Sequence, residues 1–137
     1  MMQIVQFNMD MYDDVYRIWS ETELSLGTSD TREQIQRSLQ YSQDLFLVGL
    51  VDNQIVAVVL GAYDGRRGYV HHLSVNPKFQ RSGYGRFMME ELHKKFKSKD
   101  VKKVHLFIEV DNEGVKDFYL KMGWHVRDDL MMMSYVP

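Results

Sequence analysis

The residues best suited to chemistry stand where an apolar segment runs into a glycine-rich turn. Residues 80–85 read Gln-Arg-Ser-Gly-Tyr-Gly, and the apolar spacing over residues 83–97 predicts that a helix follows at once. The first N–H groups of a helix have no partners within it and lie at the positive end of its dipole. Glycines let the backbone approach a ligand closely. Strand, turn and helix together predict an anion site suited to a pyrophosphate.

The glycine pair alone has a second interpretation, in which Gly83 and Gly85 serve only the turn and the packing of strand on helix. The segment lacks the Gly-Lys-Ser/Thr ending of a nucleotide P-loop. It also follows antiparallel strands in mid-chain, whereas a dinucleotide fold places its glycine turn after the first strand.

Two neighbouring histidines are candidates for proton transfer, because imidazole titrates near neutral pH. His71 and His72 lie on a predicted strand, so they face opposite sides and cannot act as a joint site. We expect His71 to share a face with Tyr69, Leu73 and Val75. For His71 a catalytic and a core role remain equally open, whereas for His72 the structural role is favoured.

Carboxylates offer further candidates. Glu109 ends a predicted strand and could act as a base or hold an amine, although a solvated carboxylate is the commoner case. Glu21, Glu23 and Asp30 lie around the junction of two predicted helices and would suit a cationic amine, if they do not simply face solvent.

Two segments resemble a known family. Gln80-x-x-Gly83-x-Gly85 resembles the Q/R-x-x-G-x-G/A signature of the GNAT superfamily of N-acetyltransferases. Residues 112–124, which begin with Asn112 and include Tyr119, are similar to the family segment N-x-x-A-x-x-x-Y-x-K-x-G-F/W. Two such signatures in the right order are more specific than either alone. The departures are Gln80 where Arg is commoner, Arg81 where Gly is common, and Val115 in place of Ala.

The resemblance implies that acetyl-coenzyme A is the acetyl donor. It implies that the backbone of Leu73 and Val75 pairs with the pantetheine amides, and that Asn112 hydrogen-bonds the same arm. It implies that the pyrophosphate is wrapped by main-chain N–H groups of Gln80, Arg81, Ser82, Gly83, Tyr84, Gly85 and Arg86. Tyr119 would protonate the departing sulfur. Some members of the family place a base at the positions of Tyr69 and His71, which makes His71 the candidate here.

The elements that must position these residues are predicted from apolar periodicity and turn residues. Strands are expected at residues 2–7, 45–51, 54–63, 68–75 and 102–110, with a closing hairpin over 124–136; helices are expected at 10–26, from 31, at 83–97 and at 113–122. The family resemblance gives an α/β (α+β) fold, with a mostly antiparallel sheet of about six to seven strands, about four flanking helices and a splayed strand pair holding the cofactor. We expect residues 1–137 to form a single domain.

Composition excludes several classes of protein. The chain has no cysteine and a formal net charge of −2, so disulfides, thiol catalysis and a general basic field for nucleic acid are not supported. The histidines lack ligand-like spacing, and no metal is expected. No apolar run approaches the roughly 20 residues that span a bilayer, so no membrane is expected as a partner. The methionine runs at 88–89 and 131–133 are expected to fill the core.

These observations leave an ordered set of functions. The first is an N-acetyltransferase that moves an acetyl group from acetyl-CoA to a primary amine, in a cytoplasmic protein that takes an amine acceptor as partner. The second is a non-catalytic acyl-CoA-binding or sensor domain, and the third a general α/β interaction domain. The acceptor and the oligomeric state, with a homodimer among the alternatives, stay open.

Overall fold

The structure is a computed structural model that describes residues 1–22 and 24–137. Glu23, one of the carboxylates expected near the acceptor, lies outside the described residues. Contacts divide the chain into two compact units, Met1–Phe107 and Ile108–Pro137, which are described in turn.

The first unit is built on a five-stranded sheet in the order β1-β2-β3-β4-β5. Its strands are β1 (Gln3–Gln6), β2 (Phe46–Val51), β3 (Gln54–Tyr63), β4 (Gly68–Val75) and β5 (Val104–Leu106). β1 to β4 pair antiparallel, and β5 joins β4 in parallel after a helical crossover. Asp52 and Asn53 have φ of 49° and 64°, as a two-residue hairpin with positive φ requires.

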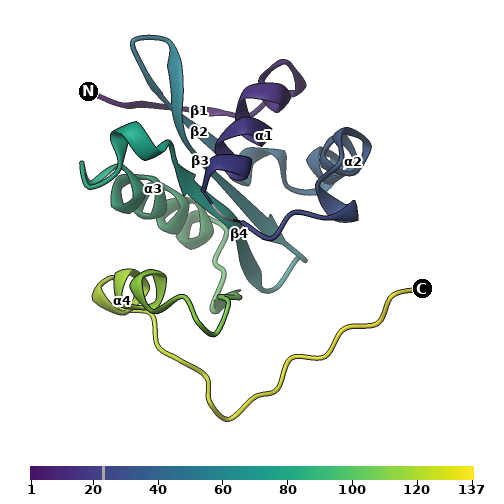
Figure 1. The fold of residues 1–137 in the computed structure, drawn as a ribbon. Helices are drawn as coiled ribbons and strands as arrows, with labels where there is room; N and C mark the ends of the chain where they lie inside the picture. Colours follow the sequence, from purple (N-terminus) through teal and green to yellow (C-terminus); the bar gives the residue numbers. More distant parts are fainter. Residues whose placement is uncertain (23) are drawn as a thin grey trace. The chain divides into compact units, whose positions relative to one another are not determined.

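Helices cover both faces of this sheet (Figure 1). α1 (Tyr12–Glu21) and α2 (Arg32–Ser42) lie on one face, and α3 (Tyr84–Ser98) lies on the other. The side-chain oxygen of Thr31 accepts the N–H of Gln34 at 3.2 Å, so the predicted cap of α2 is confirmed. Short 3-10 turns stand at Met9–Met11, Thr28–Asp30, Gln43–Leu45 and Pro77–Phe79.

Each face of the sheet has its own apolar core. On the α1 face Trp19, Phe46 and Val58 are fully buried in one cluster. On the α3 face the predicted burial of Met88 and Met89 is confirmed, since neither is exposed. A Cβ added to Gly61 would come within 2.8 Å of a Leu92 methyl carbon, so this glycine lets α3 lie close against the sheet.

The second unit contains α4 (Glu113–Lys121) and an irregular C-terminal segment. Gly123 has φ of 94°, the left-handed conformation that suits the predicted stop after this helix. At Asp128 and Asp129 the predicted turn is present, but residues 124–137 form no strand ladder among the described residues. The expected core position of the methionines at 131–133 is wrong, because all three are exposed.

The predicted fold class is confirmed, but the count of strands is wrong. The structure has five strands where six to seven are expected, and the strand expected over 102–110 holds only at Val104–Leu106. The physical reason is that apolar alternation gives a segment only a tendency to extend. A strand forms where its N–H and C=O groups find a neighbouring ladder.

Candidate active site

β4 has a bulge at the two histidines. Leu60 of β3 pairs with His71, and Val58, two residues earlier, pairs with Ser74 three residues later. One extra residue therefore stands in β4, and His72 has φ of 53°. A bulge with one residue at positive φ turns that side chain and shifts the alternation of those that follow.

The bulge corrects the expected faces of β4. Directly paired residues present their side chains on one face, so Tyr69, His71 and Ser74 share the face of Val58, which is covered by α1. Val75 pairs with Ala57 and lies on the other face. The expectation that His71 shares a face with Val75 is wrong, because a strict period of two does not continue through an extra residue.

The side chain of His72 is held in a closed polar cluster. Its Nε2 lies 2.6 Å from Oδ1 of Asp30, which is only 7% exposed, and its ring meets Trp19 edge-on at a centroid distance of 5.0 Å. The second oxygen of Asp30 accepts the N–H of Gly27 at 2.9 Å. This geometry ties the segment before α2 to the bulge, and it fits a structural role for His72.

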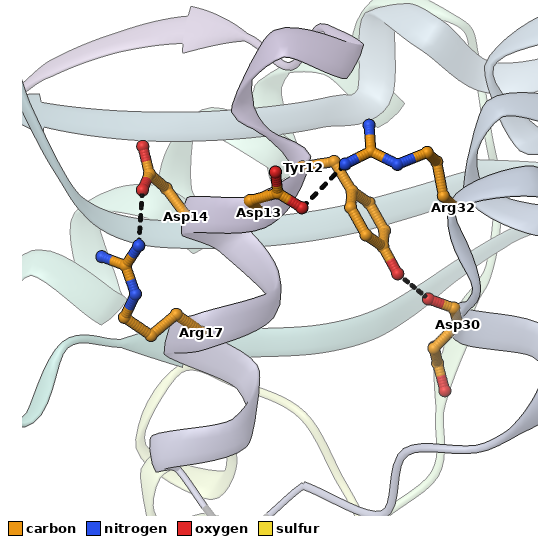
Figure 2. A network of polar contacts seen from close by, with 6 residues as sticks. All are labelled: Tyr12, Asp13, Asp14, Arg17, Asp30 and Arg32. Carbon is orange, nitrogen blue, oxygen red and sulfur yellow. Dashed lines mark hydrogen bonds and ion pairs between the residues drawn. The ribbon is translucent and has the colours of Figure 1, made fainter.

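The same segment is tied to α1 (Figure 2). The hydroxyl of Tyr12 donates to the carbonyl of Asp30 at 2.7 Å, inside the protein. Arg32 reaches back to the carboxylate of Asp13 at 2.7 Å, but both groups of this pair are exposed. The buried hydrogen bond therefore contributes more to the position of Asp30 than the exposed ion pair does. Glu21, the other described carboxylate expected near the acceptor, is exposed at the end of α1.

His71 is half-buried on the face of the sheet that α1 covers. Burial lowers the pKa of His71, the charge of His72 lowers that pKa further, and Asp30 raises it in part. An imidazole with a lowered pKa is neutral at pH 7, the state that can accept a proton. The expectation that the two histidines face opposite sides is wrong, because the bulge turns His72 toward Trp19 on the face that also carries His71. Their separate roles stay predictions.

The pairing of β4 with β5 ends early. Their parallel ladder covers Gly68 to Val70 on β4 and Val104 to Leu106 on β5. Within Met1–Phe107, the rest of β4 up to Val75 has no partner strand on that side. A backbone edge of this kind can form hydrogen bonds with an extended ligand, as the splayed strand pair of the expected fold requires.

The turn after β4 presents an uncapped helix. Gly83 has φ of 80° and precedes α3, and no side chain caps that helix. A Cβ built on Gly83 meets no atom of the described protein within 4 Å, so the space above the turn is open. Arg81 also has positive φ, at 64°, which sharpens the turn. The residues present therefore fit a phosphate group held by main-chain N–H groups.

The other side chains of this segment are engaged or exposed. Nε2 of Gln80 donates to the carbonyl of Val75 at 3.1 Å and closes the loop between them. Arg86 pairs with Glu90 at 3.0 Å on the surface of α3, and Tyr84 lies against Phe79. Ser82 and Arg81 are exposed. Any contact of Gln80 with a phosphate would use its backbone rather than its carboxamide.

Asn112 and Tyr119 belong to the second unit. The side-chain oxygen of Asn112 accepts the N–H of Val115 at 3.3 Å and caps α4. Tyr119 is 7% exposed and has Phe118 and Trp124 edge-on against its ring. Burial raises the pKa of Tyr119 well above its ordinary value, so its phenol keeps its proton throughout the neutral range.

Sequence reasoning missed a group beside His71. Nη1 of Arg67 lies 3.4 Å from Nε2 of His105, and the ring of His105 lies 6.1 Å from that of Tyr69. The register of β4 and β5 places Tyr69 and His105 side by side. The spacing of two residues between Arg67, Tyr69 and His71 could have predicted that Arg67 lies on the same side as His71. No residue near His105 in the sequence indicated that it would pair with this strand.

A hollow of about 660 Å³ lies elsewhere in the first unit, between α1, the β2–β3 turn and the loop after β4. It is lined by Met11, Asp14, Arg17, Ile18, Glu21, Leu50, Asn53, Gln54, Ile55, Asn76 and Lys78. Neither histidine of β4 lines it, whereas Glu21, one of the carboxylates expected near the acceptor, does.

The described residues form neither a metal-binding cluster nor a membrane-spanning helix. Over residues 1–22 and 24–137, no three His, Cys, Asp or Glu side chains come together as metal ligands could. In the same part of the chain, every helix is too short or too polar to span a bilayer.

Comparison with known proteins identifies the class. The model of the acetyltransferase (GNAT) family matches residues 9–124, and the chain therefore belongs to the GNAT family of acetyltransferases. It is 34% identical over 127 residues to an acetyltransferase of Pectobacterium atrosepticum, covering 93% of this chain and 90% of the relative. It is 30% identical over 133 residues to an acetyltransferase of Sodalis glossinidius, covering 97% and 94%. The protein is an acyltransferase.

Solved structures share the fold at lower identity. The PaiA N-acetyltransferase of Thermoplasma acidophilum, in complex with coenzyme A, has a TM-score of 0.82 at 17% identity, covering 93% of this chain and 92% of its own. An aminoglycoside 6′-N-acetyltransferase of Acinetobacter haemolyticus has a TM-score of 0.79 at 14% identity, covering 98% and 99%. A shared fold at this identity does not by itself fix the acceptor.

Proposed function

We propose that this protein transfers an acetyl group from acetyl-CoA to a primary amine by direct attack in a ternary complex. The observation that carries the proposal is the uncapped start of α3 at Gly83, with open space above it and the free edge of β4 leading away from it. Family membership supplies the acyl-transfer chemistry, and the relative bound to coenzyme A supports an acyl-CoA donor.

The donor is proposed to lie along β4 from the turn toward the bulge. Main-chain N–H groups of residues 80–86 hold the pyrophosphate, where the helix dipole favours negative charge. The backbone of Leu73 and Val75 pairs with the pantetheine amides along the strand edge that β5 leaves free. The thioester then reaches the level of His71, where β4 and β5 begin to pair.

His71 is the proposed base. Its neutral imidazole takes a proton from the acceptor ammonium, directly or through water, because an alkyl ammonium with a pKa of about 10.4 is not nucleophilic until it loses a proton. The amine nitrogen bonds to the carbonyl carbon, the carbon–sulfur bond breaks, and the nitrogen releases its second proton to solvent to give the neutral amide. Glu109 remains the alternative base expected from the sequence.

Tyr119 is the proposed acid. Its phenol gives its proton to the departing thiolate, and the family segment that contains Tyr119 and Asn112 supports this role. Asn112 is proposed to bind the pantetheine arm through the amide hydrogens that its capping oxygen leaves available.

Residues 1–137 are proposed to act as one N-acetyltransferase domain. The family match runs from residue 9 to residue 124 and so crosses the boundary between the two compact units. A cytoplasmic location remains a prediction from the sequence.

Titration calorimetry with acetyl-CoA tests the donor site. Gly83→Asp should abolish binding, because it puts a side chain and a negative charge where the phosphates are proposed to lie. Gly65→Asp is the matched control: Gly65 also has positive φ, 94°, and open space around it, but it lies in the β3–β4 turn. Equal affinity in the two folded variants would refute the site.

A CoA-release assay with a panel of amines then tests transfer. Release with at least one amine is expected for the native protein and not for Gly83→Asp. Binding of acetyl-CoA without release for any amine would favour the acyl-CoA-binding domain instead.

A further inference from the structure

Arg67 carries a charge that the described protein does not neutralise. Arg67 is a half-buried residue just before β4, and its guanidinium lies 3.4 Å from the imidazole of His105. Among residues 1–22 and 24–137, no carboxylate forms an ion pair with it. A charge removed in part from water without a counterion is costly, and such sites commonly bind an anion.

The nearest acid in sequence is already engaged. Asp64 accepts the N–H groups of Arg66 and Arg67 with one oxygen, at 2.8 Å and 2.7 Å, and shapes the β3–β4 turn. These hydrogen bonds lower the pKa of Asp64, and the charge of Arg66 lowers it further. Asp64 therefore acts on the backbone of the turn and leaves the guanidinium of Arg67 directed toward β5.

Arg67, Tyr69 and His71 form a row with His105. Tyr69 and His105 are register partners, and Tyr69 and His71 share a face of β4. The guanidinium lies at His105, which stands on β5 beside Tyr69, and Tyr69 is one side-chain repeat, roughly 7 Å along β4, from the proposed base. The rings of Tyr69 and His105, tilted 42° to each other, offer apolar faces for an extended chain to pack against.

The proposed direction of acetyl-CoA along β4 determines which part of the acceptor meets this row of residues. If the donor runs along β4 from Gly83 to His71, the acceptor amine lies at His71 and the rest of the acceptor continues past Tyr69 toward Arg67. Of the described carboxylates expected near the acceptor, Asp30 is buried against His72 and Glu21 is exposed on α1.

We propose that the row formed by Arg67, Tyr69, His71 and His105 is an acceptor subsite for an amine that carries a carboxylate at its far end. This inference rests on the proposed function. The planar guanidinium matches a carboxylate with two parallel hydrogen bonds. An α-amino acid is too short to place its amine at His71 and its carboxylate at Arg67. A straight-chain ω-amino acid or a dipeptide has the required length.

The test compares carboxylates with their neutral analogues. CoA release is measured for a series of straight-chain ω-amino acids and for the matching primary amides. The native protein should prefer the carboxylate by about 10- to 100-fold in kcat/KM at the best chain length, the usual effect of a hydrogen bond to a charged partner. Equal rates for acid and amide at every length would overturn the subsite and leave the transferase proposal standing.

Substitutions at Arg67 and Arg66 test which residue causes the preference for the carboxylate over the amide. Arg67→Gln should raise KM for the ω-amino acid and bring the ratio of acid to amide near one, whereas Arg67→Lys should keep part of the ratio. Arg66→Gln is the matched control, because Arg66 is exposed in the same turn. A ratio that Arg67→Gln leaves intact, or that Arg66→Gln removes, would refute the assignment; thermal melts check that each variant is folded.

Direct binding separates this inference from the proposed function. Calorimetry measures the ω-amino acid and its amide on the protein saturated with coenzyme A. Binding of the acid that disappears in Arg67→Gln, without CoA release for any amine, would support the subsite and refute transfer. No preference for the acid in either binding or turnover would refute the subsite itself.

Discussion

Two polar regions lie on either side of His71 on the same strand, and they differ in how completely their charges are partnered. Around Asp30, the carboxylate binds His72 and the N–H of Gly27, and the adjoining carbonyl accepts the hydroxyl of Tyr12. Around Arg67, the charge has the imidazole of His105 beside it and no ion pair with a carboxylate of residues 1–22 and 24–137. The closed region holds chain segments in place, whereas the open region retains capacity to bind a ligand.

The bulge of β4 produces this difference. The extra residue, His72, turns into the cluster of Asp30, and the preceding residues keep their regular alternation toward the face that carries Tyr69. Regular alternation would put the two histidines on opposite faces. With the extra residue, His72 meets Trp19 and Asp30 on the face that also carries His71, and the strand keeps its pairing on either side. Closed polar groups in this molecule should therefore affect stability, and open ones should affect catalysis and substrate choice.

Tyr119 would break this rule, because it is buried and yet is the proposed acid. Tyr119→Phe should keep acetyl-CoA affinity and lower turnover by about 10²–10⁴-fold, since only the proton donor is lost. Calorimetry and the CoA-release assay measure the two effects separately. Normal turnover would mean that the thiolate takes its proton from another donor and that Tyr119, like the other closed polar groups, affects stability rather than catalysis.

The two histidines test the comparison directly. His71→Ala should lower turnover by about 10²-fold with little loss of stability, the low end expected for a general base that water can replace. His72→Ala should lower stability and leave turnover per folded molecule nearly unchanged, because the side chain is held against Asp30. If the two variants exchange these effects, His72 faces the thioester; if neither lowers turnover, Glu109 or ordered water removes the proton.

Asp30→Ala should lower the free energy of unfolding by about 2 kcal/mol, because it leaves His72 and the N–H of Gly27 without their buried acceptor. Asp13→Ala should cost at most about 1 kcal/mol, since the pair of Asp13 with Arg32 is exposed. Urea unfolding of both variants measures the contrast. Equal losses would show that the Asp30 cluster is open to water in solution.

Local signals predicted much of the first unit. The turn at Asp52 and Asn53 gave the β2–β3 hairpin, and the bounds of β3 and β4 agree with the expected strands. α3 begins one residue later than expected, directly after Gly83. These elements are set by turn chemistry and apolar period, which neighbouring residues determine.

Features that depend on distant partners were missed. The bulge is held by the contact of Asp30 with His72, which are 42 residues apart in sequence. The sequence of residues 68–75 alone therefore did not predict the bulge. The contact of Arg67 with His105 likewise joins two strands separated by α3. The expected hairpin after α4 had alternation and a turn, but its ladder requires a neighbour that the described second unit does not provide.

The smallest expected effect is a pH dependence of stability from His71. Burial lowers the pKa of His71 in the folded protein, and unfolding returns it to about 6.5. Below about pH 6.5 the unfolded chain therefore binds more protons, so the free energy of unfolding falls as pH drops toward the lowered folded pKa and is level above this window. His71→Gln should flatten that slope, by less than about 1.4 kcal/mol per pH unit.

Urea unfolding of the native protein and His71→Gln, from about pH 8 to about pH 5, measures the difference. His93 on α3 also has a pKa lowered by burial and partly restored by Glu90, so the variant keeps a residual slope of the same sign. Adding His93→Gln should remove part of that remainder. If His71→Gln leaves the slope unchanged, the imidazole of His71 is solvated in the folded state. Its neutrality at pH 7 would then no longer come from the site, and the assignment of His71 as the base would lose its electrostatic support.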